Sequence, residues 1–188
     1  MAIASETPRS LQSAHSDGSR ERIAMLDSID WAVAALWLHV LAAMIWVGAL
    51  AFFGVAFVPA ARALAPDEAI VAFERGRRAL RTLSWIAIQL LLVTGGLNVY
   101  FRLRAGGDPG AFYIWTLAVK VLLFGAMVFH QSLQAFKYGP RIAAAAECGE
   151  TEAQSAALRE NVARWTSLLN INTAIGLVVL LLGILLGR

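Results

Sequence analysis

The sequence predicts an all-α integral membrane protein, built as an antiparallel bundle of four transmembrane helices. Two observations carry this prediction. Of the 188 residues, 59% are hydrophobic and only 15% are charged, whereas roughly a quarter are charged in an ordinary soluble domain. The hydrophobic residues are gathered in four long runs, and each run has roughly the 20 residues that a helix needs to cross a bilayer.

The same composition excludes several classes of protein. A chain this hydrophobic is neither a soluble enzyme nor a disordered protein. The net charge of +3 does not indicate a nucleic-acid-binding module, because nearly all basic residues lie beside the hydrophobic runs, where the membrane surface explains them. The single cysteine, Cys148, excludes an intramolecular disulfide and a cluster of thiolate ligands.

The chain begins with a polar N-terminal tail, residues 1–30, which is rich in Ser, Asp and Arg. This tail lacks the short hydrophobic core of a cleaved signal peptide, so we expect it to be retained in the mature protein. A four-helix transmembrane domain follows over residues 31–188. Its predicted spans are residues 31–57, 83–101, 112–134 and 166–187.

Proline and glycine mark the expected ends of these helices. All five prolines lie outside the predicted spans, as uninterrupted transmembrane helices require. The long connections, 58–82 and 138–163, have helical periodicity, so we expect them to extend the membrane helices beyond the bilayer. Breaks are expected at Gly139-Pro140 and at Gly149.

The distribution of Arg and Lys predicts the orientation. The connections 58–82 and 135–164 together carry nine basic residues, against six on the opposite face of the bundle. Because basic residues are more frequent in cytoplasmic loops, both long connections are predicted to be cytoplasmic and both termini to lie outside.

Only three ionisable side chains lie within the predicted spans, namely His39, Lys120 and His130. An ionisable residue is costly inside a bilayer and is therefore a candidate for function. The absence of Asp and Glu from the spans excludes a carboxylate proton relay and a di-iron site. Simpler readings are a core His39 hydrogen-bonded to Asn170, Asn172 or a backbone carbonyl, a snorkelling Lys120, and an interfacial His130.

The depth of each residue decides which of the three can meet. His39 lies about 7.5 Å and Lys120 about 4.5 Å before the midpoints of two helices that run in the same direction, so they are nearly level. His130 lies roughly 18 Å from His39 along the membrane normal. His39 and His130 therefore cannot be the axial ligands of one haem, whereas His39 and Lys120 can flank one from diagonal helices.

Two further residue types are candidates for the same site. Trp46 lies in mid-span, seven residues after His39 and on the same helix face, where it can pack on a flat cofactor. Met44 and Met127 are soft thioethers that can bind copper(I), although isolated methionines at helical spacing more often serve in packing. The other tryptophans lie near span ends, as in an aromatic belt: Trp31, Trp37, Trp85, Trp115 and Trp165.

Short segments in each predicted helix resemble a known family. They are WLHVLAAMIWVG at 37–48, the pieces 78–85 and VTGGL at 93–97, the stretch 115–120, and 164–170 at the start of the last helix. Together they are similar to CopD-like copper-resistance membrane proteins and to HemJ-type protoporphyrinogen oxidases, over about residues 31–187.

The resemblance implies a haem b site. In the HemJ-type enzymes a first-helix histidine and a third-helix lysine are associated with haem b and catalysis, and His39 and Lys120 match those places. The first loop lacks the Pro-Arg pair of these enzymes, and the last helix reads NINT at 170–173 instead of an Asn-Glu pair followed by proline, which favours the broader CopD-like group. The resemblance also implies a multi-pass protein of the inner (cytoplasmic) membrane of a bacterium.

Three functions remain open from the sequence. The first is a four-helix CopD-like protein that binds haem b through His39, with Lys120 as a second ligand, and handles electrons. The second is a copper-handling membrane protein, in which His39, Met44 and Met127 line a route for copper ions. The third is a non-catalytic structural subunit of a larger membrane complex, in which residues 1–30 and 138–163 contact other subunits. All three are in contact with the lipid bilayer, and none involves nucleic acid.

Overall fold

The computed structural model describes residues 9–106, 109–147 and 152–186, and these form helices joined by short turns. Four helices are long: α1 (Arg9–Phe52), α3 (Pro66–Arg104), α4 (Gly110–Ser132) and α6 (Glu152–Leu186). Two are short, α2 (Val58–Arg62) and α5 (Gly139–Glu147). Two π-helical segments, η1 (Phe53–Phe57) and η2 (Leu133–Tyr138), lie directly before the short helices.

The described residues contain four helical segments that are long and hydrophobic enough to cross a membrane. They are Trp31–Arg62, Glu68–Arg104, Gly110–Ala144 and Ala156–Ile184. Large hydrophobic side chains on their outer faces, such as Leu122 and Val55, are 73% and 80% exposed, as lipid-facing residues would be. The predicted fold, an all-α multi-pass membrane protein with four spans, is confirmed.

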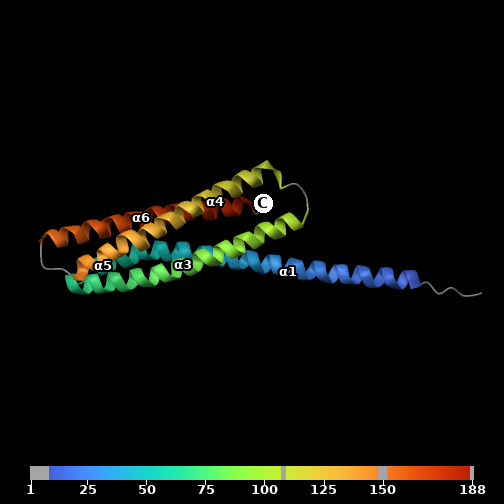
Figure 1. Cartoon of the computed structure of the whole chain (residues 1–188), viewed down its shortest axis with the longest axis horizontal. Helices are drawn as coiled ribbons and strands as arrows, with labels where there is room; N and C mark the ends of the chain where they lie inside the picture. Colours follow the sequence, from blue (N-terminus) through green and yellow to red (C-terminus); the bar gives the residue numbers. More distant parts are fainter. Residues whose placement is uncertain (1–8, 107–108, 148–151, 187–188) are drawn as a thin grey trace, which may run out of the picture.

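The four long helices run alternately up and down and do not pack equally closely (Figure 1). Helix α1 packs along α3 and along α6, and α4 packs along α6, whereas α3 and α4 hardly touch each other. The bundle is therefore closed on three sides and loosely packed on the fourth. The connection between α3 and α4 lies at one end, here called the α3–α4 end, and α5 lies at the opposite end, here called the α5 end (Figure 1).

Two prolines lie inside continuous helices, and each follows a π-helical segment. The Val58 N–H donates to the Phe53 carbonyl and the Gly139 N–H donates to the Gln134 carbonyl, so both bonds reach five residues back instead of four. Proline has no N–H, and its ring crowds the carbonyl four residues earlier, which favours one widened turn before it. The expected break at Gly139-Pro140 is thus wrong, because the helix continues through it, while Gly149 lies outside the described residues.

The first helix also begins earlier than the first predicted span. Helix α1 starts at Arg9, so much of the polar tail has a helical backbone, and it extends well beyond the other helices at the α3–α4 end (Figure 1). No other helix in the described part of the chain runs beside this extension.

Aromatic side chains fill the core toward the α5 end. Phe53 lies 5.4 Å from Trp165 and 6.0 Å from Phe73 between ring centroids, in edge-to-face contacts. Gly76 lets α3 approach this cluster, since a Cβ there would lie 2.5 Å from the Phe57 ring. Trp165 is only 3% exposed, so it belongs to the core instead of to the expected aromatic belt. Dense packing at this end leaves the space in the bundle at the other end.

Candidate functional site

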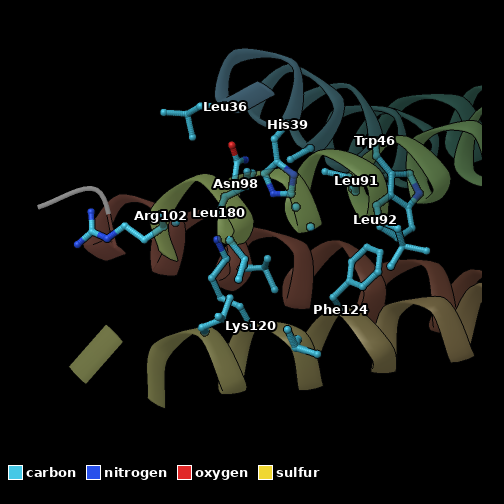
Figure 2. Close-up of a pocket in the computed structure, with 18 of the residues that line it drawn as sticks. Leu36, His39, Trp46, Leu91, Leu92, Asn98, Arg102, Lys120, Phe124 and Leu180 are labelled. Atoms are coloured by element: carbon cyan, nitrogen blue, oxygen red, sulfur yellow. The ribbon is translucent and has the colours of Figure 1, made fainter. Parts of the chain in front are cut away.

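A cavity of about 900 Å³ lies between the four long helices, toward the α3–α4 end (Figure 2). Its volume falls within the roughly 300–1,000 Å³ of sites that bind cofactors and other small molecules. Hydrophobic side chains from α1, α3, α4 and α6 form most of its wall, with a few polar groups among them. This is the composition of a site for a largely apolar ligand with a few directing contacts.

The cavity is open toward the lipid between α3 and α4. Leu92 on α3 and Val121 on α4 both line it, yet they are 59% and 62% exposed. Among the neighbouring pairs of long helices, these two pack together least. A ligand dissolved in the membrane can therefore reach the cavity from the side.

His39 lines the cavity from α1 and is held by Thr94 on α3. The distance from His39 Nδ1 to Thr94 Oγ1 is 2.9 Å, and the Thr94 hydroxyl donates to the Leu90 carbonyl at 2.7 Å. A hydroxyl has one proton to donate, so Thr94 accepts from His39, and Nδ1 carries the imidazole hydrogen. The other ring nitrogen, Nε2, then has a free lone pair, which is the form of histidine that binds metals.

A glycine allows the imidazole to lie in this position. A Cβ at Gly95, the residue after Thr94, would lie 3.2 Å from His39 Cε1, which is closer than most side-chain contacts. The ring therefore rests against the backbone of α3, directed from α1 into the space between the helices (Figure 2). Thr94 and Gly95 together fix both its hydrogen bonding and its direction.

Lys120 enters the same cavity from α4, on the side opposite His39 (Figure 2). It lies within electrostatic range of the His39 ring. Its Nζ is near α6, since a Cβ at Gly183 would be 3.6 Å from it. The two residues that the sequence places at one depth are thus brought to one cavity, although Lys120 does not touch His39.

Trp46 and Met127 form the deeper, hydrophobic part of the wall. Trp46 is 1% exposed and meets Phe124 edge to face, with 6.1 Å between ring centroids. Its indole Nε1 has no hydrogen-bond partner among the described residues. Met127 is 2% exposed and lines the cavity as well. Trp46 therefore lies where the sequence analysis expects it, in the same cavity as His39.

Other candidates lie elsewhere. Met44 is 58% exposed and does not line the cavity, so the structure does not bring together the three residues of the copper route. His130 also lies away from the cavity, near the end of α4. Asn172 donates to the Met127 carbonyl at 3.1 Å instead of to His39. In the described part of the chain, no three His, Cys, Asp or Glu side chains are close enough to hold a metal ion.

Asn98, Arg102 and Tyr113 also line the cavity toward the α3–α4 end, and the sequence analysis missed the last two of them. The Arg102 guanidinium lies over the Tyr113 ring, 5.3 Å from its centroid, and so links α3 to α4. A signal was present: Thr94, Asn98 and Arg102 follow each other at intervals of four residues and therefore share one face of α3. The sequence analysis used Arg102 only to predict the orientation.

The chain matches no protein-family model, no curated protein and no solved structure. The function must therefore be argued from the cavity and from the residues around it.

Proposed function

We propose that the protein binds haem b in this cavity, where His39 Nε2 would bind its iron, and that it handles electrons in the membrane. The observation that carries the proposal is the hydrogen bond from His39 to Thr94, because it leaves Nε2 as the nitrogen available to a metal inside a cavity of cofactor size. A bound haem supplies a one-electron redox centre, whose potential depends on its axial ligands and on burial.

The residues around His39 fit such a group. The wall is mostly hydrophobic, and Trp46 and Phe124 offer aromatic surface for a flat ring. Lys120 stands on the opposite side of the cavity, where it is either a second ligand or a charge beside the haem. The likeness of segments 37–48 and 115–120 to CopD-like and HemJ-type proteins supports the same assignment. A single histidine and one buried methionine make a poorer copper site, since Met44 faces outward.

Absorption spectra of the purified protein test this function. The protein, isolated from membranes or reconstituted with haemin, is expected to show a Soret band and to develop sharp α and β bands on reduction with dithionite. Extraction and pyridine assay should give a stoichiometric amount of haem b. Reconstituted protein without these bands would refute the proposal.

Replacing Thr94 by valine is expected to weaken haem binding by roughly 10–100-fold, the usual effect of losing the partner that orients a metal-bound histidine. Valine has nearly the same shape but cannot accept the Nδ1–H bond. Thr94→Ser keeps the hydroxyl and is the matched control. Titration with haemin, followed at the Soret band, checks the result. Equal affinities for the Val and Ser variants would contradict the assigned tautomer.

The protein is proposed to lie in the inner membrane of a bacterium, with the connections 58–82 and 138–163 in the cytoplasm and both termini outside. The excess of Arg and Lys in these connections supports this orientation. In a Cys148→Ser background, Ile70→Cys and Glu150→Cys should resist a membrane-impermeant thiol reagent in intact cells, whereas Arg104→Cys should react. The reverse labelling pattern would invert the orientation.

A role within a larger membrane complex is a second candidate, and the extension of α1 favours it. An isolated polar helix is marginally stable in water, so a helix that runs past the bundle gains most from a partner. The proposed contacts are residues 1–30 and 138–163. Trypsin is expected to cut at Arg20 or Arg22 in the isolated protein and to spare these sites in gently solubilised membranes. Protection of the isolated protein would contradict this candidate.

A further inference from the structure

Two basic side chains reach the cavity, and neither forms an ion pair with an acidic side chain among the described residues. Lys120 on α4 and Arg102 on α3 both line it, and Asp and Glu are absent from the described residues of its wall. The ion pairs in the described part of the chain involve Glu74 and Glu160, which both lie outside the cavity. Lys120 is half-buried, and a cation inside a membrane protein is costly unless an anion or several polar groups compensate it, whereas Arg102 is exposed in the last turn of α3.

Both cations are held in place by the bundle. Lys120 Nζ lies beside Gly183 of α6, and the Arg102 guanidinium is fixed over the Tyr113 ring of α4. Arg102 lies eight residues after Thr94, which is about 12 Å along α3 toward the α3–α4 end. In Figure 2, Asn98 lies between His39 and Arg102, so polar groups extend from the histidine toward the α3–α4 end of the cavity.

The opposite part of the wall has no such groups. Trp46, Phe124 and Met127 enclose it, and Trp46 and Met127 are nearly fully buried. The cavity therefore has a hydrophobic inner part and a basic outer part. This distribution of charged and hydrophobic groups fits a ligand with a hydrophobic body and anionic groups at one edge only.

We propose that Arg102 and Lys120 bind the carboxylate groups of the cavity's ligand and so fix its orientation. This inference rests on the proposed function, because haem b carries its two carboxylates on one edge of a hydrophobic ring. The planar guanidinium of arginine can donate two parallel hydrogen bonds to one carboxylate. Such charge-assisted hydrogen bonds are stronger than those between neutral groups. Lys120 is thereby a charge that holds the haem edge, not an axial ligand.

Haemin and its dimethyl ester separate this role from iron binding, since the ester has the same ring and iron but no carboxylates. Both are titrated into the full-length protein in nanodiscs of zwitterionic lipid, and binding is followed by the Soret shift and by quenching of tryptophan fluorescence. The wild type is expected to bind haemin at least about tenfold more tightly than the ester. Arg102→Gln and Lys120→Gln should each lower the affinity for haemin by about tenfold and leave that for the ester unchanged.

Arg104→Gln is the matched control, because Arg104 lies over Tyr100 and does not line the cavity, and it should leave both affinities unchanged.

Equal binding of haemin and ester by the wild type would overturn the inference and leave the proposed function standing. Loss of ester binding in Lys120→Gln would make Lys120 an iron ligand and overturn its assigned role. If adding anionic lipid to the nanodiscs lowers the affinity of the wild type for haemin as much as Arg102→Gln does, the two cations would be assigned to lipid headgroups instead. Binding of neither probe by the wild type would refute the proposed function itself.

Discussion

Replacement of His39 by alanine is expected to abolish haem binding. Loss of the axial ligand should cost more than the roughly 10–100-fold in affinity that loss of an orienting partner costs. The variant should also keep its fold, because the imidazole is only half-buried at a cavity wall, where it contacts α3 through the Thr94 hydroxyl and the Leu91 backbone. Haem content per chain, measured by the pyridine assay after purification, checks the expectation.

His130→Ala is the matched control for this result. His130 is also a histidine of a membrane helix, but it does not line the cavity. The variant should retain the full complement of haem with an unchanged spectrum. Full retention of haem in His39→Ala would show that His39 does not bind the iron, and loss of haem in His130→Ala alone would place the haem at the other end of the bundle.

Replacement of Glu74 by glutamine is expected to destabilise the fold by about 3–5 kcal/mol, the cost of leaving a buried charge unpaired. Arg77 donates from Nε to one Glu74 oxygen at 2.9 Å and from Nη2 to the other at 2.6 Å, and its side chain is only 5% exposed. Its guanidinium also lies against Gly139, where an added Cβ would collide with Nη1. The pair thus joins α3 to the start of α5. The free energy of unfolding can be followed by tryptophan fluorescence in mixed micelles with increasing SDS.

The chain provides an exposed pair for comparison. Glu160 and Arg164 are paired at 2.7 Å on α6, but their side chains are 62% and 61% exposed. Glu160→Gln should leave the stability unchanged, since such surface pairs contribute little. A Glu74→Gln variant as stable as Glu160→Gln would show that Arg77 finds another partner and that the buried pair does not hold this end of the bundle.

The fold could be predicted because its main signal is local. The number, order and approximate limits of the spans follow from the length of each hydrophobic run. The widened turns before Pro59 and Pro140 could not be predicted in the same way. Helix propensity identifies proline as a helix breaker, whereas in the bundle one π-helical turn before each of these prolines keeps the helix continuous.

The candidate site was predictable only in part. Depth along a helix is counted from the sequence, so His39 and Lys120 could be placed at one level. The face of the first helix on which each residue lies could also be derived from the sequence. Met44 is two residues from Trp46, which at 100° per residue puts the two side chains on nearly opposite faces. The partner of His39 was not readable, because Thr94 becomes its neighbour only through the packing of α1 on α3 and the small size of Gly95.

Pulsed electron paramagnetic resonance of the ferric protein, labelled with 15N-histidine, tests most directly whether His39 binds the haem iron. The account predicts a hyperfine coupling to an imidazole nitrogen that disappears in His39→Gly and returns when imidazole is added to the vacated space. A coupling that persists in His39→Gly without imidazole, or a haem-loaded wild type with no imidazole coupling at all, would contradict it.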